Sequence, residues 1–308
     1  MNKTDLEEPI AAASGPELNR RILARPHEAY DTAFGCPRNF LNNRFIYVVI
    51  SARARGLSIG VNLNPDKHCN FHCAYCEVNF AELPRETALD LAVLAEELDQ
   101  TLAWVHTGKI AEHPFYHGLP AELLRLRQVN LSGDGEPTLC PHFVEALQTV
   151  VHVRARGRLP FFKLVLMTNG TALDQPQVQD GLKLFTRHDE VWVKLDGGTQ
   201  AYLDKVNQPG CPIESILSNI LLLARRRPVV IQSLFPMIGG EEPPEEEIEE
   251  YALRLKELKA AGAQIPLVQI YSATRPTPNS ECSHLPLKCL SRIAQTVRQK
   301  TGLTAEVF

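Results

Sequence analysis

The 308-residue sequence has few aromatic residues, no long apolar run and no low-complexity tract. Aromatic residues make up 7% of the chain, whereas hydrophobic residues make up 44% and charged residues 22%, as is typical of a globular protein with a substantial core. Because no apolar run approaches the roughly 18 residues of a membrane span, we expect no membrane partner. Disordered and collagen-like classes are excluded as well.

The chain also lacks a signal region and an excess of basic charge. Residues 1–9 are acidic and contain no apolar stretch, so we expect a cytoplasmic protein. The 32 basic residues against 36 acidic ones give a net charge of −4, which provides no global electrostatic argument for nucleic-acid binding. A local basic patch, and with it a nucleic-acid partner, stays open.

Short apolar runs alternate with segments of helical period along most of the chain. Several runs are apolar on both faces, as expected of parallel strands that are covered on both sides. The runs lie at 57–63, 128–131, 163–167, 190–195, 229–234 and 267–271, and the helical segments lie near 86–105, 142–153, 213–226, 245–261 and 286–300. This alternation predicts an α/β fold, a partial (β/α)6 TIM-type barrel of parallel strands.

We predict two parts in the chain. Residues 1–45 are polar, with isolated apolar residues, and form an N-terminal extension, whereas residues 46–308 form the barrel domain. The connection that follows the first predicted strand is much longer than the others. Loops at the carboxyl ends of barrel strands build active sites, so this long connection lies where chemistry is expected.

Three of the eight cysteines lie close together in that connection. Cys69, Cys73 and Cys76 form a CxxxCxxC pattern in the segment CNFHCAYC. Three thiolates at this spacing can hold three irons of a [4Fe-4S] cluster and leave the fourth iron open to another ligand. With His68 or His72 they can instead form a closed zinc site of three cysteines and one histidine. These eight residues alone leave both alternatives open.

Further along the chain the sequence resembles the radical S-adenosylmethionine (radical SAM) superfamily. The superfamily's signature is CxxxCxxC with an aromatic residue before the third cysteine, and Tyr75 occupies that place. The segment SGDGEPTL at 132–139 is similar to the superfamily's glycine-glycine-glutamate segment, and MTNG at 167–170 and KLDG at 194–197 follow in the expected order. These four segments distinguish the sequence from a simple zinc protein.

The resemblance becomes narrower in five segments. They read GVNLNP at 60–65, GEPTL at 135–139, VKLDG at 193–197, IQSL at 231–234 and VQIY at 268–271. Together they resemble the wyosine-biosynthesis-related group of iron-sulfur oxidoreductases within the superfamily. The similarity extends over roughly residues 45–308.

The resemblance implies a [4Fe-4S] cluster on Cys69, Cys73 and Cys76, with S-adenosyl-L-methionine (AdoMet) on the open iron. No catalytic side chain is assigned. The residues expected to bind the cofactors are Tyr75, Gly133, Asp134, Gly135, Glu136, Thr168, Asn169, Lys194, Asp196, Gln232 and Arg275. Residue chemistry leaves other roles open, because Asn169 can be a turn residue, Gln232 can satisfy the backbone and Arg275 can lie in a surface loop.

The implied function is reductive cleavage of AdoMet to a 5′-deoxyadenosyl radical, which abstracts hydrogen from an unidentified substrate. The implied partners are AdoMet, that substrate and a reducing protein such as flavodoxin or ferredoxin. The wyosine-related group favours a nucleotide or RNA substrate, whereas the acidic balance of the chain also allows a small metabolite or a peptide. A non-catalytic zinc or iron-sulfur binding protein is the alternative of another class.

A second cluster would have to use cysteines outside the motif. Cys36, Cys282 and Cys289 are candidates, but the last two are separated by six residues, which is loose for such a motif. We therefore expect the isolated cysteines to be small buried residues.

Overall fold

The computed structural model describes residues 40–275 and 277–308 of the chain. An eight-stranded sheet organises them, in the spatial order β1-β2-β3-β4-β5-β6-β8-β10. The strands are β1 (Ile46–Ser51), β2 (Gly56–Val61), β3 (Leu126–Leu131), β4 (Leu164–Thr168), β5 (Glu190–Lys194), β6 (Val229–Leu234), β8 (Val268–Tyr271) and β10 (Ala305–Val307). All neighbours pair in parallel except β1, which forms an antiparallel hairpin with β2.

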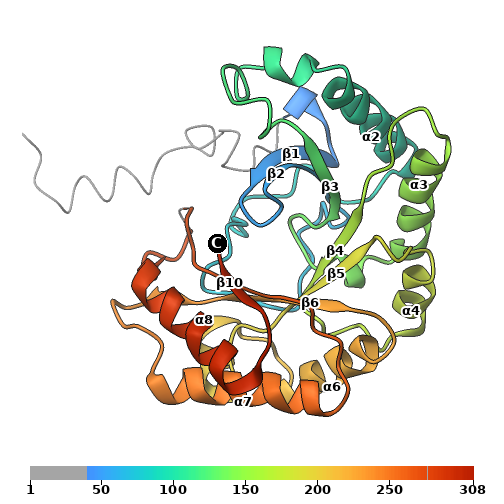
Figure 1. The fold of residues 1–308 in the computed structure, drawn as a ribbon. Coiled ribbons are helices and arrows are strands. Elements are labelled where there is room, and N and C mark those ends of the chain that lie inside the picture. Colours follow the sequence, from blue (N-terminus) through green and yellow to red (C-terminus); the bar gives the residue numbers. More distant parts are fainter. Residues whose placement is uncertain (1–39, 276) are drawn as a thin grey trace, which may run out of the picture.

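Helices connect the parallel strands and cover the convex side of the sheet, which curls into an incomplete ring (Figure 1). They are α2 (Leu91–His106), α3 (Phe143–Ala155), α4 (Pro176–Leu182), α5 (Gln200–Val206), α6 (Ile213–Ala224), α7 (Glu245–Ala260) and α8 (Leu287–Thr301). A small separate sheet pairs β7 (Pro236–Ile238) with β9 (Cys282–His284). Within the described residues, no helix is both long and apolar enough to cross a bilayer.

The predicted fold class, a partial α/β barrel, is confirmed, and the sheet is wider than predicted. All six predicted runs form parallel strands. The sequence analysis missed β1 and β10 at the two edges of the sheet, as well as the short helices α4 and α5. β10 has only three residues, too few to show a pattern, and the antiparallel pairing of β1 depends on the tight turn at residues 52–55.

The two edges of the sheet approach each other without pairing through the backbone. The Arg55 guanidinium in the β1–β2 turn lies 2.9 Å from a carboxylate oxygen of Glu306 in β10. The Arg53 guanidinium lies 4.1 Å from the ring centre of Tyr271, at the end of β8. Side chains therefore join the edges of the ring where a closed barrel would have a strand ladder.

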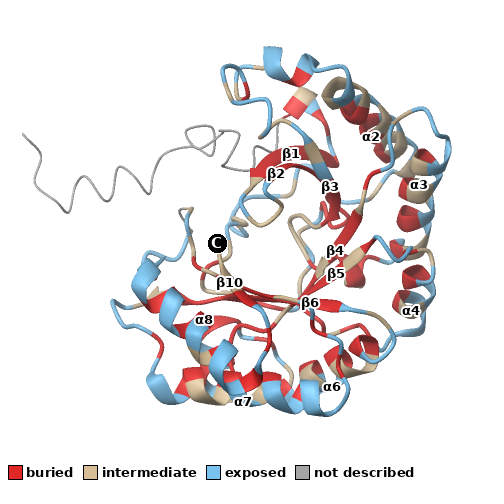
Figure 2. Ribbon diagram, viewed as in Figure 1, coloured by how far each residue is buried: buried red, intermediate tan, exposed pale blue. Residues whose placement is uncertain are grey.

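The main apolar core lies between the sheet and its helices, and Figure 2 shows buried residues along the strands and on the inner helix faces. A smaller apolar cluster of Val165, Trp192 and Val230 lies apart from it. Polar residues form the next row of the same strands, because Lys194 pairs in register with Gln232 and Gln232 with Gln269. Side chains on alternate residues share a face, so this polar row lies on the same side of the sheet as the small apolar cluster, toward the carboxyl ends of the strands.

Residues 40–45, which the sequence analysis assigned to the N-terminal extension, pack against α2. Phe40 is fully buried and contacts the ring of Trp104 edge-on. The buried carboxylate of Glu97 in α2 accepts backbone N–H groups from Arg44 at 2.7 Å and from Phe45 at 2.9 Å. The segment that enters β1 is thus fixed to the first helix. The division at residue 45 stays a prediction.

Replacement of Glu97 by alanine should leave these two N–H groups without acceptors. We expect Glu97→Ala to lower the free energy of unfolding by about 2–4 kcal/mol, measured by urea denaturation. Glu96→Ala, on the exposed side of the same helix, is the matched control and should change it by less than about 0.5 kcal/mol. Equal stabilities of the two variants would contradict the role of Glu97.

Candidate functional site

The cysteine loop, residues 62–90 between β2 and α2, is fixed to two other loops at the carboxyl ends of the strands. The backbone N–H of His72 donates to the carbonyl of Asn207 at 2.9 Å, and that of Ala74 donates to Val206 at 2.8 Å. On the other side, the N–H of Glu136 donates to the carbonyl of His68 at 3.0 Å. The loop is therefore held between the end of α5 and the loop that follows β3.

A buried polar network joins the cysteine motif to the end of β5. The Tyr75 hydroxyl donates to the carboxylate of Asp196. The Asn207 side-chain amide donates to the same carboxylate at 2.7 Å and lies 3.3 Å from the sulfur of Cys73. The other carboxylate oxygen of Asp196 accepts the backbone N–H of Leu234 at 2.7 Å. One carboxylate thus orients the motif's aromatic residue, Asn207 and the end of β6.

Lys194 is the cation of this network. Its ammonium group lies 3.5 Å from Asp196, donates to the Tyr271 hydroxyl at 3.2 Å and lies 4.8 Å from the ring centre of Tyr75. Burial acts to lower the pKa of Lys194, but the nearby Asp196, Tyr271 and Cys73 raise it above its ordinary value. Burial and Asp196 also raise the pKa of Tyr75 well above its ordinary value. Lys194 is thus a fixed positive charge and Tyr75 a neutral hydroxyl.

The three cysteine thiols have donor chemistry that suits a cluster. Burial raises the pKa of Cys69 to about 12 and that of Cys76 to about 11, and it raises the pKa of Cys73 as well. Neutral thiols are therefore favoured until a positively charged metal centre supplies compensating charge. The carbonyl oxygen of the Asn207 side chain is buried without a donor in the described part of the chain, so it can accept from a group that binds there.

The closed zinc site considered from the sequence is not assembled. Among residues 40–275 and 277–308, no three His, Cys, Asp or Glu side chains converge on a position for one metal ion. His72 instead contacts the ring of Phe80 edge-on. A [4Fe-4S] cluster takes each thiolate on a different iron, so it does not require the three sulfurs to converge on one metal ion.

The loop that follows β3 packs tightly on the cysteine loop. A Cβ atom on Gly133 would lie 2.2 Å from the side-chain oxygen of Asn62, and one on Gly135 would lie 2.1 Å from the carbonyl of His68. Asp134 accepts from the Asn62 amide at 2.6 Å. Internal packing thus already accounts for both glycines, which were expected to bind a cofactor.

Glu136 joins the ends of β3 and β4. Its buried carboxylate accepts the hydroxyls of Thr138 and Thr168, both at 2.6 Å, and the backbone N–H of Asn169 at 2.7 Å. Burial raises the pKa of Glu136, and these hydrogen bonds oppose the rise. The Asn169 amide in turn donates to Asn70 in the cysteine loop at 2.7 Å. Glu136 and Asn169 therefore position the cysteine loop relative to the sheet.

The remaining predicted residues lie at the edge of this arrangement. The Gln232 amide donates to Gln269 at 3.1 Å, so the two side chains partly satisfy each other. Arg275 forms an ion pair with Glu77, the residue after Cys76, at 2.7 Å. The structure thus brings predicted residues from the ends of the second, third, fourth and last predicted strands against the cysteine loop.

Two of the three cysteines considered for a second cluster lie in the described residues. Cys289 is buried in α8, and Cys282 is half-buried in β9. Cys36, the third candidate for an auxiliary cluster, lies outside the described residues.

Sequence reasoning missed Asn207 and Tyr271 as parts of the site. Asn207 directly follows α5. It contacts Cys73 in space, although the two residues are 134 positions apart in the sequence. An asparagine at the end of a short helix is common, so no local signal distinguishes it. Tyr271 ends a predicted strand, and its position next to Lys194 depends on the curl of the sheet.

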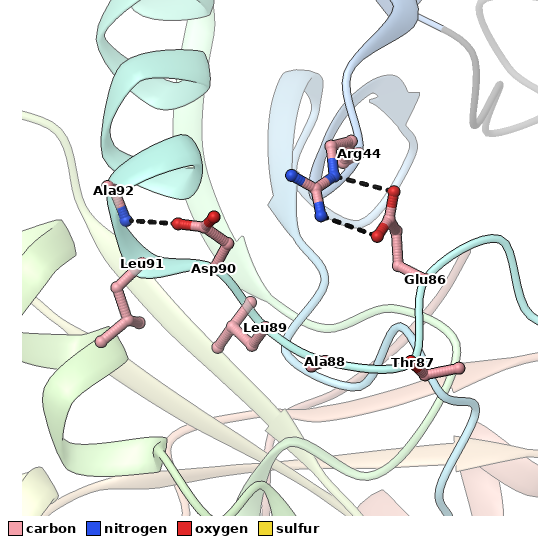
Figure 3. Close-up of a pocket in the computed structure, with 8 residues that line it drawn as sticks. All are labelled: Arg44, Glu86, Thr87, Ala88, Leu89, Asp90, Leu91 and Ala92. Carbon is pink, nitrogen blue, oxygen red and sulfur yellow. Dashed lines mark hydrogen bonds and ion pairs between the residues drawn. The ribbon is translucent and has the colours of Figure 1, made fainter.

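A shallow pocket at the start of α2 is separate from this site (Figure 3). Figure 3 shows Arg44 in a two-point contact with Glu86, at 2.8 and 2.7 Å, and Asp90 accepting the N–H of Ala92. These polar groups satisfy one another, and no predicted site residue lines the pocket. We assign no chemistry to it.

Residues 63–255 match the family model of the Radical SAM superfamily. Because this match covers more than half of the chain, the protein belongs to the Radical SAM superfamily. It is an enzyme of radical SAM type, and its cofactors are a [4Fe-4S] cluster and AdoMet. The resemblance predicted from the cysteine motif is confirmed.

Curated relatives carry no activity in their names. A "UPF0026 protein" of Helicobacter pylori (strain ATCC 700392 / 26695) is 26% identical over 243 residues, which are 78% of this chain and 68% of the relative. "UPF0026 protein slr1464" of Synechocystis sp. (strain ATCC 27184 / PCC 6803 / Kazusa) is 28% identical over 181 residues, 57% of each chain. This chain thus matches little more than half of the length of the second relative.

Solved structures show the same fold at low identity. A structure of TYW1 with a lysine-pyruvate adduct bound has a TM-score of 0.52 and 14% identity, over 92% of this chain and 89% of that one. A variant of spore photoproduct lyase has a TM-score of 0.50 and 12% identity, over 78% of this chain and 73% of that one. At these identities the likeness concerns the fold alone.

The geometry of the network predicts that Asp196 is its central group. Replacement by alanine should leave the half-buried Lys194 without its anion and remove the acceptor of Tyr75, Asn207 and Leu234. We expect Asp196→Ala to lower the free energy of unfolding of the metal-free protein by about 3–5 kcal/mol in urea denaturation.

The matched control is Asp204→Ala, an exposed aspartate in α5. It should shift the free energy of unfolding by less than about 0.5 kcal/mol. A loss in Asp196→Ala no larger than in this control would show that the network contributes little to the fold.

Proposed function

We propose that this protein binds a [4Fe-4S] cluster through Cys69, Cys73 and Cys76, cleaves AdoMet reductively and abstracts hydrogen from a substrate inside the partial barrel. One observation carries the proposal: Asn207 connects the sulfur of Cys73 to the Asp196 carboxylate, at 3.3 and 2.7 Å. The cysteine motif is thereby fixed over the carboxyl ends of the strands, the end of the barrel where enzymes of this architecture bind their substrates.

When bound, the cluster supplies the electron that splits AdoMet into methionine and a 5′-deoxyadenosyl radical. The chain's own residues have positioning roles in this proposal. Lys194 provides a positive charge beside Cys73 that lowers the cost of the negatively charged thiolates. Asn207 and Tyr75 hold the motif against Asp196.

The AdoMet site in this proposal lies along the ends of β3, β4 and β5. Glu136 and Asn169 hold the backbone there in a fixed position, and within residues 40–275 and 277–308 the second carboxylate oxygen of Glu136 accepts one hydrogen bond, from Asn169. That oxygen has a remaining lone pair for an ammonium group. Asp134, Thr168, Gln232 and Arg275 are the further proposed contacts, with Gly133 and Gly135 shaping the loop.

The substrate is proposed only as a class. The resemblance to the wyosine-related group favours a nucleotide or RNA, and a small metabolite or a peptide is the alternative. The reducing partner is proposed to be a flavodoxin or ferredoxin.

Anaerobic incubation of the reconstituted protein with AdoMet and dithionite tests the reaction class. We expect 5′-deoxyadenosine to form, and to form faster when the cell-derived fraction that contains the substrate is added, either tRNA or small molecules. If a reduced cluster is present, but AdoMet is not cleaved and does not change the EPR spectrum of the cluster, the proposed AdoMet site is wrong.

The cluster assignment predicts the behaviour of Cys73→Ala. This variant should lose most of its iron and sulfide and form no 5′-deoxyadenosine after anaerobic reconstitution. Cys211→Ala, a half-buried cysteine outside the network, is the matched control and should keep both. A Cys73→Ala protein with wild-type iron content and cleavage rate would contradict the assignment.

The AdoMet site predicts a separate effect for Glu136→Gln. A glutamine amide cannot accept the N–H of Asn169 and an ammonium group as the carboxylate does, so AdoMet affinity should fall roughly tenfold or more. Equilibrium dialysis with the reconstituted protein measures this affinity, and iron content should stay unchanged. The control is Glu145→Gln, at an exposed position in α3. Equal AdoMet affinities of the two variants would show that Glu136 does not bind AdoMet.

A further inference from the structure

A cavity of about 900 Å³ opens at the amino ends of the strands, opposite the end that carries the cysteine loop. Its lining comes from the β1–β2 turn, from the first residues of β3, β5, β6 and β8, and from the loops that lead into β5 and β6. Gln128, Trp192 and Gln269 contribute from the strands themselves. The volume is within the range of small-molecule sites, and no residue of the proposed AdoMet site lines it.

The lining is strongly basic in a chain that is acidic as a whole. Seven basic and three acidic side chains line the cavity, whereas the net charge of the chain is −4. All three acids are engaged: Glu306 pairs with Arg55, Glu190 with Lys163, and Asp189 with Arg154. Five arginines remain without an ion pair among the described residues, and they are Arg53, Arg127, Arg187, Arg226 and Arg227.

Two N–H donors in the lining are buried and unsatisfied within the described residues. They are the side-chain amide nitrogen of Gln128 and the Nε of Arg227. Gln128 is only 1% exposed, so its amide is cut off from bulk water. A buried donor without an acceptor is unfavourable, and a ligand rich in acceptor atoms would recover that free energy.

An apolar wall lies beside the basic side chains. Trp192 and Val230 belong to the small apolar cluster, and Leu267 packs against it. The Arg227 guanidinium lies 5.2 Å from the ring centre of Phe185, which also lines the cavity. Guanidinium groups without a carboxylate partner suit phosphate oxygens, and the apolar wall suits a carbon skeleton or a flat ring. Long nucleic acids are instead bound by charges spread along an open surface.

We propose that this cavity binds a small phosphorylated molecule of about nucleotide size. The row formed by Lys194, Gln232 and Gln269 lies between this cavity and the cysteine motif. Its occupation therefore does not depend on the cluster or on AdoMet, and the proposal can fail or succeed independently of the proposed function.

Isothermal titration of the full chain with pyrophosphate and with ADP, at physiological ionic strength, tests the proposal. We expect saturable binding of both probes, and tighter binding of ADP because it also contacts the apolar wall. The double variant Arg127→Gln/Arg187→Gln removes two exposed charges at the cavity and should weaken binding roughly tenfold or more. Gln128→Leu, which keeps the lining charge, should also weaken it.

The matched control removes two charges elsewhere. Arg156→Gln/Arg225→Gln changes the net charge equally, but neither residue lines the cavity, so affinity should change less than about twofold. If both double variants lose affinity for the probes equally, the loss reflects long-range electrostatic attraction and not a site in the cavity, and the proposal is overturned. The proposal would also be overturned if neither pyrophosphate nor ADP binds, including the case in which tRNA binds and the two probes do not.

Discussion

The carboxylate of Asp196 is the acceptor on which the site depends. It is fully buried at the end of β5, and it receives hydrogen bonds from Tyr75, from the Asn207 amide and from the backbone of β6. A buried carboxylate with this many donors fixes the groups around it, because any displacement would leave a charge or a donor unsatisfied. The position of the cysteine loop over the barrel follows from this single group.

A second carboxylate repeats this arrangement on the other side of the loop. Glu136 connects the ends of β3 and β4 and, through Asn169, reaches Asn70. Two acidic residues that follow different strands thus support one cysteine-rich segment. Since the handedness and spacing of the strands are set by backbone pairing, the sheet determines the spacing of these supports, and the loop adapts to it.

Local sequence predicted the parts of this structure that depend on local pattern. The six buried strands have apolar residues on both faces, and the motif from Cys69 to Cys76 was expected at the carboxyl end of a strand. The local sequence did not predict Asn207 beside Cys73, the antiparallel β1, or the basic cavity that brings Arg53 and Arg227 together. Each of these depends on how far the sheet curls, which is a sum of small twists that no segment encodes alone. The roles of the individual cofactor residues stay predictions for the same reason.

The ion pair between Arg55 and Glu306 has a consequence for access to the interior. Because β1 and β10 share no backbone ladder, the seam of the ring is joined by exposed side chains, with 72% of the Arg55 side chain accessible. Exposed ion pairs contribute little free energy, about 0–1 kcal/mol. Among the described residues, widening of the ring at this seam would therefore break exposed side-chain contacts and no strand pair, unlike the opening of a closed barrel.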